Sequence, residues 1–246
     1  MKPFSDQSVT TYAVFGLLAI ACVAVVLIYF RPFSSKKKKP APAKPTGPRA
    51  VIVIGDHEFE VPCVAMAATI FKLGGMHVVL ASASGGDCIP EKSSLETPIA
   101  KEAGDRQDPV WMEVLNQAHT TVPLERVKAA ETAILFVAGG PQMLRDLRQT
   151  TLAGSSPSPF CAFLQRLCVQ VHAGGGVIGA VGHGVRGLPE EAALQEPGVR
   201  RFAGRLDSAV EEIADSMLAA RNAYVARHAA AANAMSGGGA DAKKED

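Results

Sequence analysis

The sequence predicts an α/β domain, in which helices flank a parallel sheet, preceded by one transmembrane helix. Between residues 50 and 190, short apolar runs rich in β-branched residues alternate with helix-length segments, and most runs end at glycine. This alternation is typical of βαβ units, whose strands lie parallel and are buried on both faces. Residues 12–30 form an uncharged apolar run that is long enough to cross a bilayer. We therefore expect an α/β domain that is attached to a membrane.

Four strands and two helices of the domain can be placed from the pattern. The expected strands cover residues 50–55, 78–82, 133–137 and 177–181, and the expected helices cover 62–74 and 159–172. Ligand sites in parallel sheets lie at the carboxyl ends of the strands. The stretches with this position are 56–60, 139–141 and 182–184. We expect these three stretches to lie together in the folded domain.

The apolar run at 12–30 reads YAVFGLLAIACVAVVLIYF and contains neither a charge nor a proline. As a helix it spans roughly 30 Å, the thickness of the hydrocarbon core. Arg31 and the lysines at 36–39 follow the run, whereas only Lys2 precedes it. This bias predicts a single-pass protein in a lipid bilayer, with its C-terminal part in the cytosol. A cleaved signal peptide is the alternative, but its apolar core is usually shorter and lacks such a stop-transfer flank.

An amphipathic helix is predicted after the domain. Apolar residues recur there at spacings of three and four, and they are Leu206, Val210, Ile213, Met217, Ala220 and Tyr224. Docking against the sheet and a coiled-coil contact with a partner are both compatible with this stripe.

The expected organisation therefore has six parts. They are an N-terminal tail at 1–11, a transmembrane helix at 12–30, a basic and Pro-rich linker at 31–48, the α/β domain at 49–203, the amphipathic helix at 204–235 and a disordered tail at 236–246.

Six blocks of the domain occur in the order and spacing of one known family. They are RAVIVIGDHEFE at 49–60, KLGGMHVVLASASGG at 72–86, IPEKSSL at 89–95, TTVPLERV at 120–127, ILFVAGGPQMLRDL at 134–147 and GGVIGAVGHGVRGL at 175–188. They resemble the ThiJ/PfpI (DJ-one) family, whose fold is class I glutamine amidotransferase-like and flavodoxin-like. The branch that the chain resembles most contains glyoxalase III and heat-shock chaperone proteins. The resemblance implies a flavodoxin-like sheet for this chain.

The block that resembles the family's nucleophile elbow lacks the nucleophile. The family reads Ala-Val-Cys-His-Gly, whereas this chain reads AVGHG at 180–184. Gly182 stands at the nucleophile position, so covalent thiol chemistry cannot start there. His183 keeps the place of the family's histidine in what would be a degenerate site. The resemblance also implies that Gly139 and Gly140 offer backbone N–H groups as an oxyanion hole, where a small carbonyl ligand would bind.

The position of the family's glutamate is open between two residues. Counting back without gaps from Gly75 places Cys63 there, whereas a short gap would place Glu60 there instead. Cys63 is either a displaced thiol or a small buried apolar residue. Cys161 and Cys168 are seven residues apart on one face of a helix and far from the elbow, so we expect both in the core.

Composition and motifs exclude several classes of function. The net charge is +1, which gives no basic field for nucleic-acid binding. The sequence has no CxxC pair, metal-ligand spacing or phosphate loop, so we expect no metal and no cofactor.

The favoured hypothesis is a catalytically inactive, membrane-anchored member of the family that acts as a binding, sensing or scaffold module. An active glyoxalase III (lactate dehydratase) or deglycase-type enzyme, using Cys63 or His183, is the alternative. A chaperone-like holdase is a third possibility. Family members commonly form dimers, so the resemblance also implies a homodimer.

Overall fold

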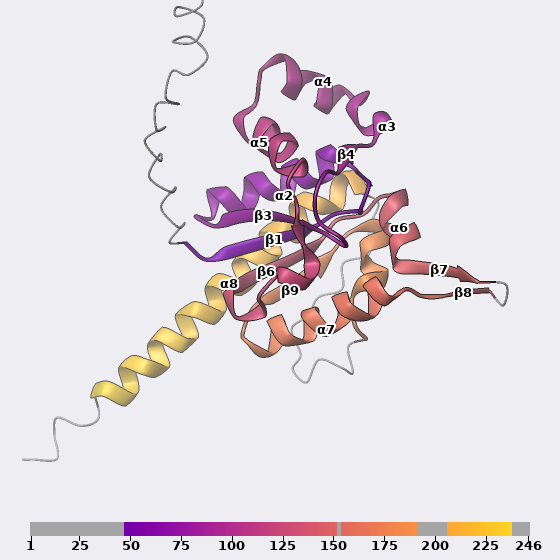
Figure 1. The fold of residues 1–246 in the computed structure, drawn as a ribbon. Helices are drawn as coiled ribbons and strands as arrows, with labels where there is room; N and C mark the ends of the chain where they lie inside the picture. Colours follow the sequence, from indigo (N-terminus) through magenta and orange to yellow (C-terminus); the bar gives the residue numbers. More distant parts are fainter. Residues whose placement is uncertain (1–46, 152–153, 191–205, 238–246) are drawn as a thin grey trace, which may run out of the picture. The chain divides into compact units, whose positions relative to one another are not determined.

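The computed structural model describes residues 47–151, 154–190 and 206–237. A five-stranded parallel sheet lies at the centre of this part (Figure 1), with the strand order β5-β3-β1-β6-β9. The strands are β1 (Arg49–Val53), β3 (His77–Ser82), β5 (Val122–Pro123), β6 (Thr132–Val137) and β9 (Val177–Ala180). Helices cover both faces, so the fold is α/β and flavodoxin-like. The four strands predicted from the sequence are present within one or two residues of their expected bounds.

The predicted transmembrane helix at 12–30 lies outside the described residues, as does nearly all of the linker. Within the part of the chain that the structure describes, no helix has the length and apolar character that crossing a bilayer requires.

Both faces of the central strands are buried, which explains their continuous apolar character. Ile52 of β1 and Phe136 of β6 belong to the hydrophobic cluster on one face, and Val51 and Leu135 belong to the cluster on the other. Val51 pairs in register with Val79 of β3 on one side and with Leu135 on the other. Successive side chains of each strand therefore pack into different layers.

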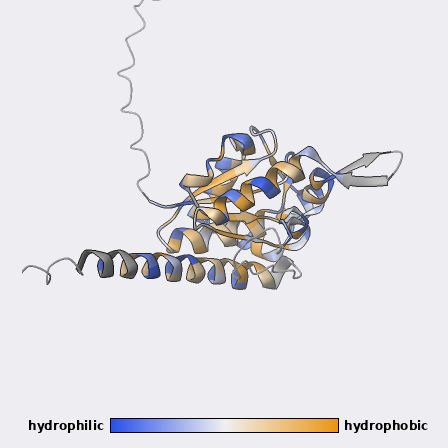
Figure 2. Ribbon diagram, turned by 90° about the horizontal axis from the view of Figure 1, so that it is seen from below, coloured by the Kyte–Doolittle hydropathy of each residue, from blue (hydrophilic) through white to orange (hydrophobic). Residues whose placement is uncertain are grey.

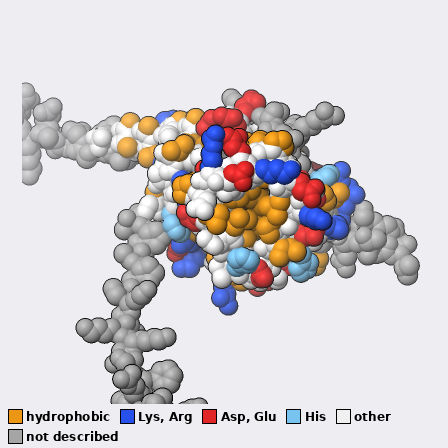
Figure 3. Space-filling view, turned by 90° about the horizontal axis from the view of Figure 1, so that it is seen from above, with side chains coloured by type: hydrophobic (Ala, Val, Ile, Leu, Met, Phe, Trp, Pro, Cys, Tyr) orange, Lys and Arg blue, Asp and Glu red, His pale blue; other side chains and the backbone are white. Residues whose placement is uncertain are grey.

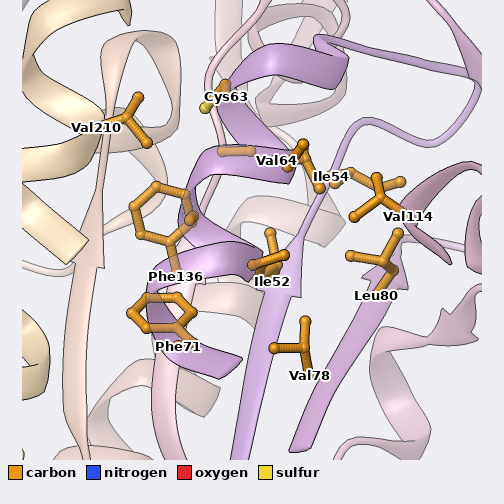
Figure 4. Packing of buried hydrophobic residues seen from close by; sticks show 14 of the residues in the cluster. Ile52, Ile54, Cys63, Val64, Phe71, Val78, Leu80, Val114, Phe136 and Val210 are labelled. Carbon is orange, nitrogen blue, oxygen red and sulfur yellow. The ribbon is translucent and has the colours of Figure 1, made fainter. Parts of the chain in front are cut away.

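Three longer helices cover the first face: α2 (Val61–Leu73), α5 (Pro109–Ala118) and α8 (Leu206–Gly237). Short helices α3 (Lys92–Leu95) and α4 (Pro98–Asp105) lie beside α2. The second face carries α6 (Pro141–Leu147) and α7 (Pro159–Ala173). Figure 2 shows that the helices turn hydrophobic residues inward and polar residues outward. In the first layer, the rings of Phe71 and Phe136 meet edge to face, with centroids 6.0 Å apart (Figure 4).

Helices α4 and α5 are not among the elements predicted from the sequence, although their starts follow a known rule. Thr97 accepts a hydrogen bond from the N–H of Ala100 at 3.2 Å, and Pro98 follows it. Asp108 accepts hydrogen bonds from two backbone N–H groups, and Pro109 follows it. A side-chain oxygen before a proline is a common helix start, because proline needs no hydrogen-bond partner for an N–H.

The remaining elements are short. Parallel strands β2 (Glu58–Phe59) and β4 (Ile89–Pro90) pair with each other, and β7 (Arg148–Thr151) pairs antiparallel with β8 (Gly154–Pro157) in a hairpin that extends from the body in Figure 1. In the described part of the chain there are also three 3₁₀ turns: η1 (Leu124–Arg126), η2 (Ala129–Glu131) and η3 (Gly182–Gly187).

Helix α8 docks against the sheet through its first half. Val210, Ile213, Ala214 and Met217 are buried between α2 and the strands β6 and β9. The predicted stripe is right at Val210, Ile213 and Met217, whereas Ala220 is exposed. The structure therefore has the first alternative for this helix, docking against the sheet.

Glycines on the body make room for α8. A Cβ at Gly179 would lie 2.5 Å from the Met217 sulfur, and a Cβ at Gly74 would lie 2.5 Å from Leu218 Cδ1. The helix therefore approaches the backbone of β9 and the end of α2 more closely than a larger residue would allow.

Candidate functional site

Three loops meet at the carboxyl edge of the sheet. The strand order changes direction between β1 and β6, which is where ligands bind in folds of this type. The N–H of Ala138 donates to the carbonyl oxygen of Val53 at 2.9 Å, and the N–H of Val181 donates to that of Val137 at 3.1 Å. These hydrogen bonds place the stretches 56–60, 139–141 and 182–184 at one edge.

The turn after β9 has the geometry of an elbow but no side chain at its apex. Gly182 has φ +50°, in the left-handed region that side chains rarely adopt. A strained strand-to-helix turn of this kind holds the nucleophile in elbow enzymes. His183 follows it and is half-buried. The turn therefore has a backbone conformation suited to a nucleophile, but Gly182 offers no nucleophilic atom at its apex.

Gly184 fixes this turn against the end of β6. A Cβ at this position would lie 2.6 Å from the carbonyl oxygens of both Val137 and Ala138. The Val137 oxygen accepts a hydrogen bond from the N–H of Val181, and the N–H of Ala138 donates to Val53, so the backbone at both residues is held by the sheet. Only glycine lets the elbow close onto the strand.

Glu60 lies beside the loop predicted to form an oxyanion hole. Gly140 has φ +112°, and a Cβ there would lie 3.5 Å from Glu60 Cγ and 3.9 Å from Glu60 Oε1. Glu60 is the N-cap residue of α2, whereas Cys63 lies in the first turn of the helix with 5% of its surface exposed. The structure therefore brings Glu60 and Gly140 together and keeps Cys63 in the hydrophobic layer.

A pocket of about 400 Å³ opens between α2, α3, α4 and α8. Its lining consists of Glu60, Pro62, Cys63, Met66, Ser93, Ser94, Thr97, Pro98, Ile99 and Val210. Figure 4 shows Cys63 on α2 and Val210 on α8, the two helices that meet at this pocket. Gly182 and His183, although described, are not part of the lining. Glu60 therefore links the pocket to the Gly140 loop.

A polar network that the sequence analysis did not foresee joins the loop after β1 to its neighbours. Asp56 Oδ1 accepts hydrogen bonds from the N–H and the hydroxyl of Ser84, at 2.8 and 2.7 Å. The N–H of Asp56 donates to Asp146 Oδ2 at 2.7 Å, and Gln142 Nε2 donates to Asp146 Oδ1 at 2.7 Å. Burial raises the pKa of Asp146, and the two hydrogen bonds oppose that shift. Asp56 directly follows the strand expected at 50–55, but Asp146 lies in α6 and gave no sequence signal.

A second group of polar side chains lies beneath the loop after β3. Ser82 and Thr121 share a hydrogen bond of 2.9 Å between their hydroxyls, and the Cys88 thiol donates to the carbonyl oxygen of Asp56 at 3.2 Å. Burial raises the pKa of Cys88, so its thiol stays protonated at neutral pH. This cysteine holds two loops together and is not set up as a nucleophile.

The cysteines of α7 are buried, as expected, but the position of Cys161 corrects the sequence analysis. Its thiol lies 3.8 Å from the carbonyl oxygen of Arg186 in η3, the turn that begins at Gly182. Cys161 is therefore close to the elbow segment in space, because α7 packs against η3. Burial raises the pKa of Cys168 to about 12 and raises that of Cys161 as well, so both thiols stay protonated.

Comparisons with known proteins give only distant structural likenesses. No model of a protein family and no curated protein matches this chain. Among solved structures, it is similar to the Rapid Encystment Protein 24 KDa of Francisella tularensis, with 12% identity, a TM-score of 0.48, and coverage of 70% of this chain and 98% of that chain. It is also similar to glyoxalase III from Candida albicans, with 18% identity, a TM-score of 0.44, and coverage of 61% of each chain. Likenesses this distant say nothing about activity or substrate.

Proposed function

We propose that this chain is a membrane-anchored, catalytically inactive ThiJ/PfpI-like domain that binds a small ligand and acts as a sensing or scaffold module on the cytosolic face of a membrane. The observation that carries the proposal is the elbow, where Gly182 adopts φ +50° and offers no atom that could attack a substrate. The six sequence blocks at 49–188 support the family, and the run at 12–30 supports the anchor.

The groups that remain are suited to binding. Backbone N–H groups at Gly139 and Gly140 would donate hydrogen bonds to a carbonyl oxygen, and the Glu60 carboxylate lies beside Gly140. His183 follows the elbow, but an acid or base alone contributes only part of the chemistry that a thiol nucleophile starts. A small carbonyl compound would therefore bind at this edge without turnover.

One observation favours the alternative of an active glyoxalase III-type enzyme. Cys63 and Glu60 line the same pocket, so a thiol and a carboxylate lie in one site although Gly182 has no nucleophilic side chain. The thiol is almost fully buried in the hydrophobic layer, which is a poor setting for a thiolate. We therefore keep the inactive domain as the proposal and use Cys63 in its test.

The test is lactate formation from methylglyoxal by the purified full-length chain, after circular dichroism has shown that it is folded. We expect no turnover above buffer. Steady turnover that Cys63→Ala or His183→Ala abolishes would identify an enzyme and end the proposal. Turnover that survives both substitutions points to a contaminating enzyme, which an inactive sample from a second purification route would reveal.

The anchor is tested separately. Membranes from cells that express the full-length chain are extracted with alkaline carbonate, which strips peripheral proteins. We expect the chain to stay in the membrane pellet and to move to the supernatant when residues 12–30 are deleted. Protease added to sealed cells should leave the domain intact, and cleavage from outside would contradict the cytosolic orientation.

A further inference from the structure

We propose that the pocket between α2, α3, α4 and α8 binds a small organic amine, with its apolar body in the pocket and its ammonium group at Glu60. The inference goes beyond the proposed function, which has a carbonyl compound at the Gly140 loop, and assigns a second class of ligand to the neighbouring pocket.

The body of the ligand is apolar because most of the wall is apolar. Met66, Pro98, Ile99 and Val210 supply it, together with the nearly buried Cys63. A volume of about 400 Å³ is within the range of small-molecule sites. Ile99 is 56% exposed, so the apolar wall continues to the outer surface. Figure 3 views the side that carries α3 and α4 and shows hydrophobic side chains gathered within a ring of charged ones.

The lining has three hydroxyls, and the protein already uses two of them, those of Ser94 and Thr97; the third belongs to Ser93. Ser94 donates to the carbonyl oxygen of Glu91 at 2.7 Å and accepts from the N–H of Val61 at 3.4 Å. Thr97 donates to the carbonyl oxygen of Ser94 at 3.1 Å and accepts from the N–H of Ala100. Each hydroxyl has one proton, which is engaged, so neither offers a strong donor to a ligand.

The helix starts at the pocket are poor sites for an anion. Helices α2 and α4 both point their first turns at it, but each has a proline in that turn, Pro62 and Pro98, and proline has no N–H. The N–H groups of Val61 and Ala100 are engaged by the two hydroxyls. The first turns of these two helices therefore have fewer N–H groups to offer an anion than helix starts without proline.

Glu60 is the charged residue of the described lining, and its charge selects the ligand. A carboxylate accepts hydrogen bonds at both oxygens, so it can hold a ligand donor in addition to contacts within the protein. An ammonium group that reaches Glu60 forms a charge-assisted hydrogen bond at the edge of an apolar pocket, where such bonds are strong. A carboxylate ligand of the same shape would be repelled.

The probe set is tryptamine with its neutral analogue 3-ethylindole and its anionic analogue indole-3-propionate, titrated by calorimetry into the full-length chain in detergent. Titration into detergent alone provides the blank. We expect tryptamine to bind about tenfold or more tightly than either analogue, and Glu60→Gln to remove this preference while leaving the affinity for 3-ethylindole unchanged.

Two further variants locate the site. Glu58 lies two residues earlier, pairs with Arg145 at 3.4 Å and is not part of the pocket lining, so Glu58→Gln should leave the preference for tryptamine intact. Ile99→Trp places a larger side chain at the mouth and should weaken all three ligands. Thermal melting of each variant shows that a loss of binding does not come from unfolding.

Binding of indole-3-propionate as tight as that of tryptamine overturns the inference, and so does a preference for tryptamine that Glu60→Gln leaves in place. Failure of all three ligands to bind the folded chain overturns it as well. Methylglyoxal turnover is measured on the same samples. Turnover removes the inactive-domain proposal whatever the amines do, whereas absent amine binding without turnover removes only the present inference.

Discussion

The loops that follow β1 and β3 are held by side chains, whereas the turns that follow β6 and β9 are held by backbone packing on glycine. Asp56 fastens the first pair of loops through Ser84 and Asp146. At the second pair, Gly140 lies against Glu60, and Gly184 closes onto β6. The difference shows that the two pairs of loops depend on different contacts, because steric fit at glycine requires no hydrogen-bonding side chain.

The steric half of this comparison predicts the largest effect. Gly184→Ala places a Cβ within 2.6 Å of two strand carbonyl oxygens, and we expect it to lower the free energy of unfolding by about 3 kcal/mol. Urea denaturation of the full-length chain measures the loss. Gly104→Ala is the control, since a Cβ there meets nothing within 4 Å in the exposed helix α4, and it should stabilise by about 0.5–1 kcal/mol. Equal stabilities for the two variants would contradict the role of Gly184.

The loops held by side chains predict the next largest loss of stability. Asp146→Ala leaves the N–H of Asp56 and the amide of Gln142 without their acceptor, so we expect a loss of about 2 kcal/mol by urea denaturation. Asp146→Asn keeps one acceptor oxygen for Asp56 and should cost less. An alanine variant as stable as the asparagine variant would mean that the network does not hold the loop.

The difference in stability between the wild type and Asp146→Asn should depend on pH, and its sign follows from the pKa of Asp146. Because burial raises the pKa of Asp146, the folded state takes up a proton at a higher pH than the unfolded state. As the pH falls through the raised folded-state pKa, the wild type should gain stability relative to Asp146→Asn, which cannot titrate there. A relative loss on acidification would show that the charged carboxylate is the stabilised form.

Placing a side chain at position 182 should lower the stability by a smaller amount. Gly182→Cys must adopt φ +50°, which costs about 1–2 kcal/mol for a residue with a Cβ. We expect the new thiol to react with iodoacetamide, as mapped by mass spectrometry, because the half-buried apex is accessible. A folded variant without labelling at position 182 would mean that the turn does not present its apex as an elbow does.

The smallest expected effect is at the thiols of α7, which should not react with iodoacetamide in the folded chain. Burial raises the pKa of Cys168 to about 12, so at pH 8 the folded chain should leave Cys168 unlabelled by iodoacetamide over hours. Unfolding in urea should make it react at the rate of an ordinary thiol. Labelling of Cys168 in the folded chain would show that α7 opens on this timescale.

The fold could be predicted largely because its strands are apolar on both faces. The runs at β1, β3, β6 and β9 carry no polar interruption, and glycine or serine ends them, so period and length both indicate buried parallel strands. The site loops follow from the same reasoning, since parallel topology places the carboxyl ends of adjacent strands together. Gly182 was recognisable only because the elbow block resembles a family in which that position is cysteine.

Other features depend on contacts that no local pattern encodes. Asp56 and Asp146 are ninety residues apart, and their hydrogen bond requires α6 to fold back over the first loop. The strands of the β7–β8 hairpin are polar and lack alternation, so period gives no strand signal there. Helices α4 and α5 had readable starts at Thr97-Pro98 and Asp108-Pro109, and with them the pocket wall could have been anticipated.

The close fit of α8 has a consequence for how the protein is made. Met217 and Leu218 fill space that Gly179 and Gly74 leave open, and α8 is the last of the described elements to be synthesised. Until it emerges from the ribosome, the layer over β6, β9 and α2 has no cover, and that apolar surface is exposed to chaperones or to other nascent chains. Completion of the core therefore waits until α8 has been synthesised, and a chain truncated before Val210 would be prone to aggregate.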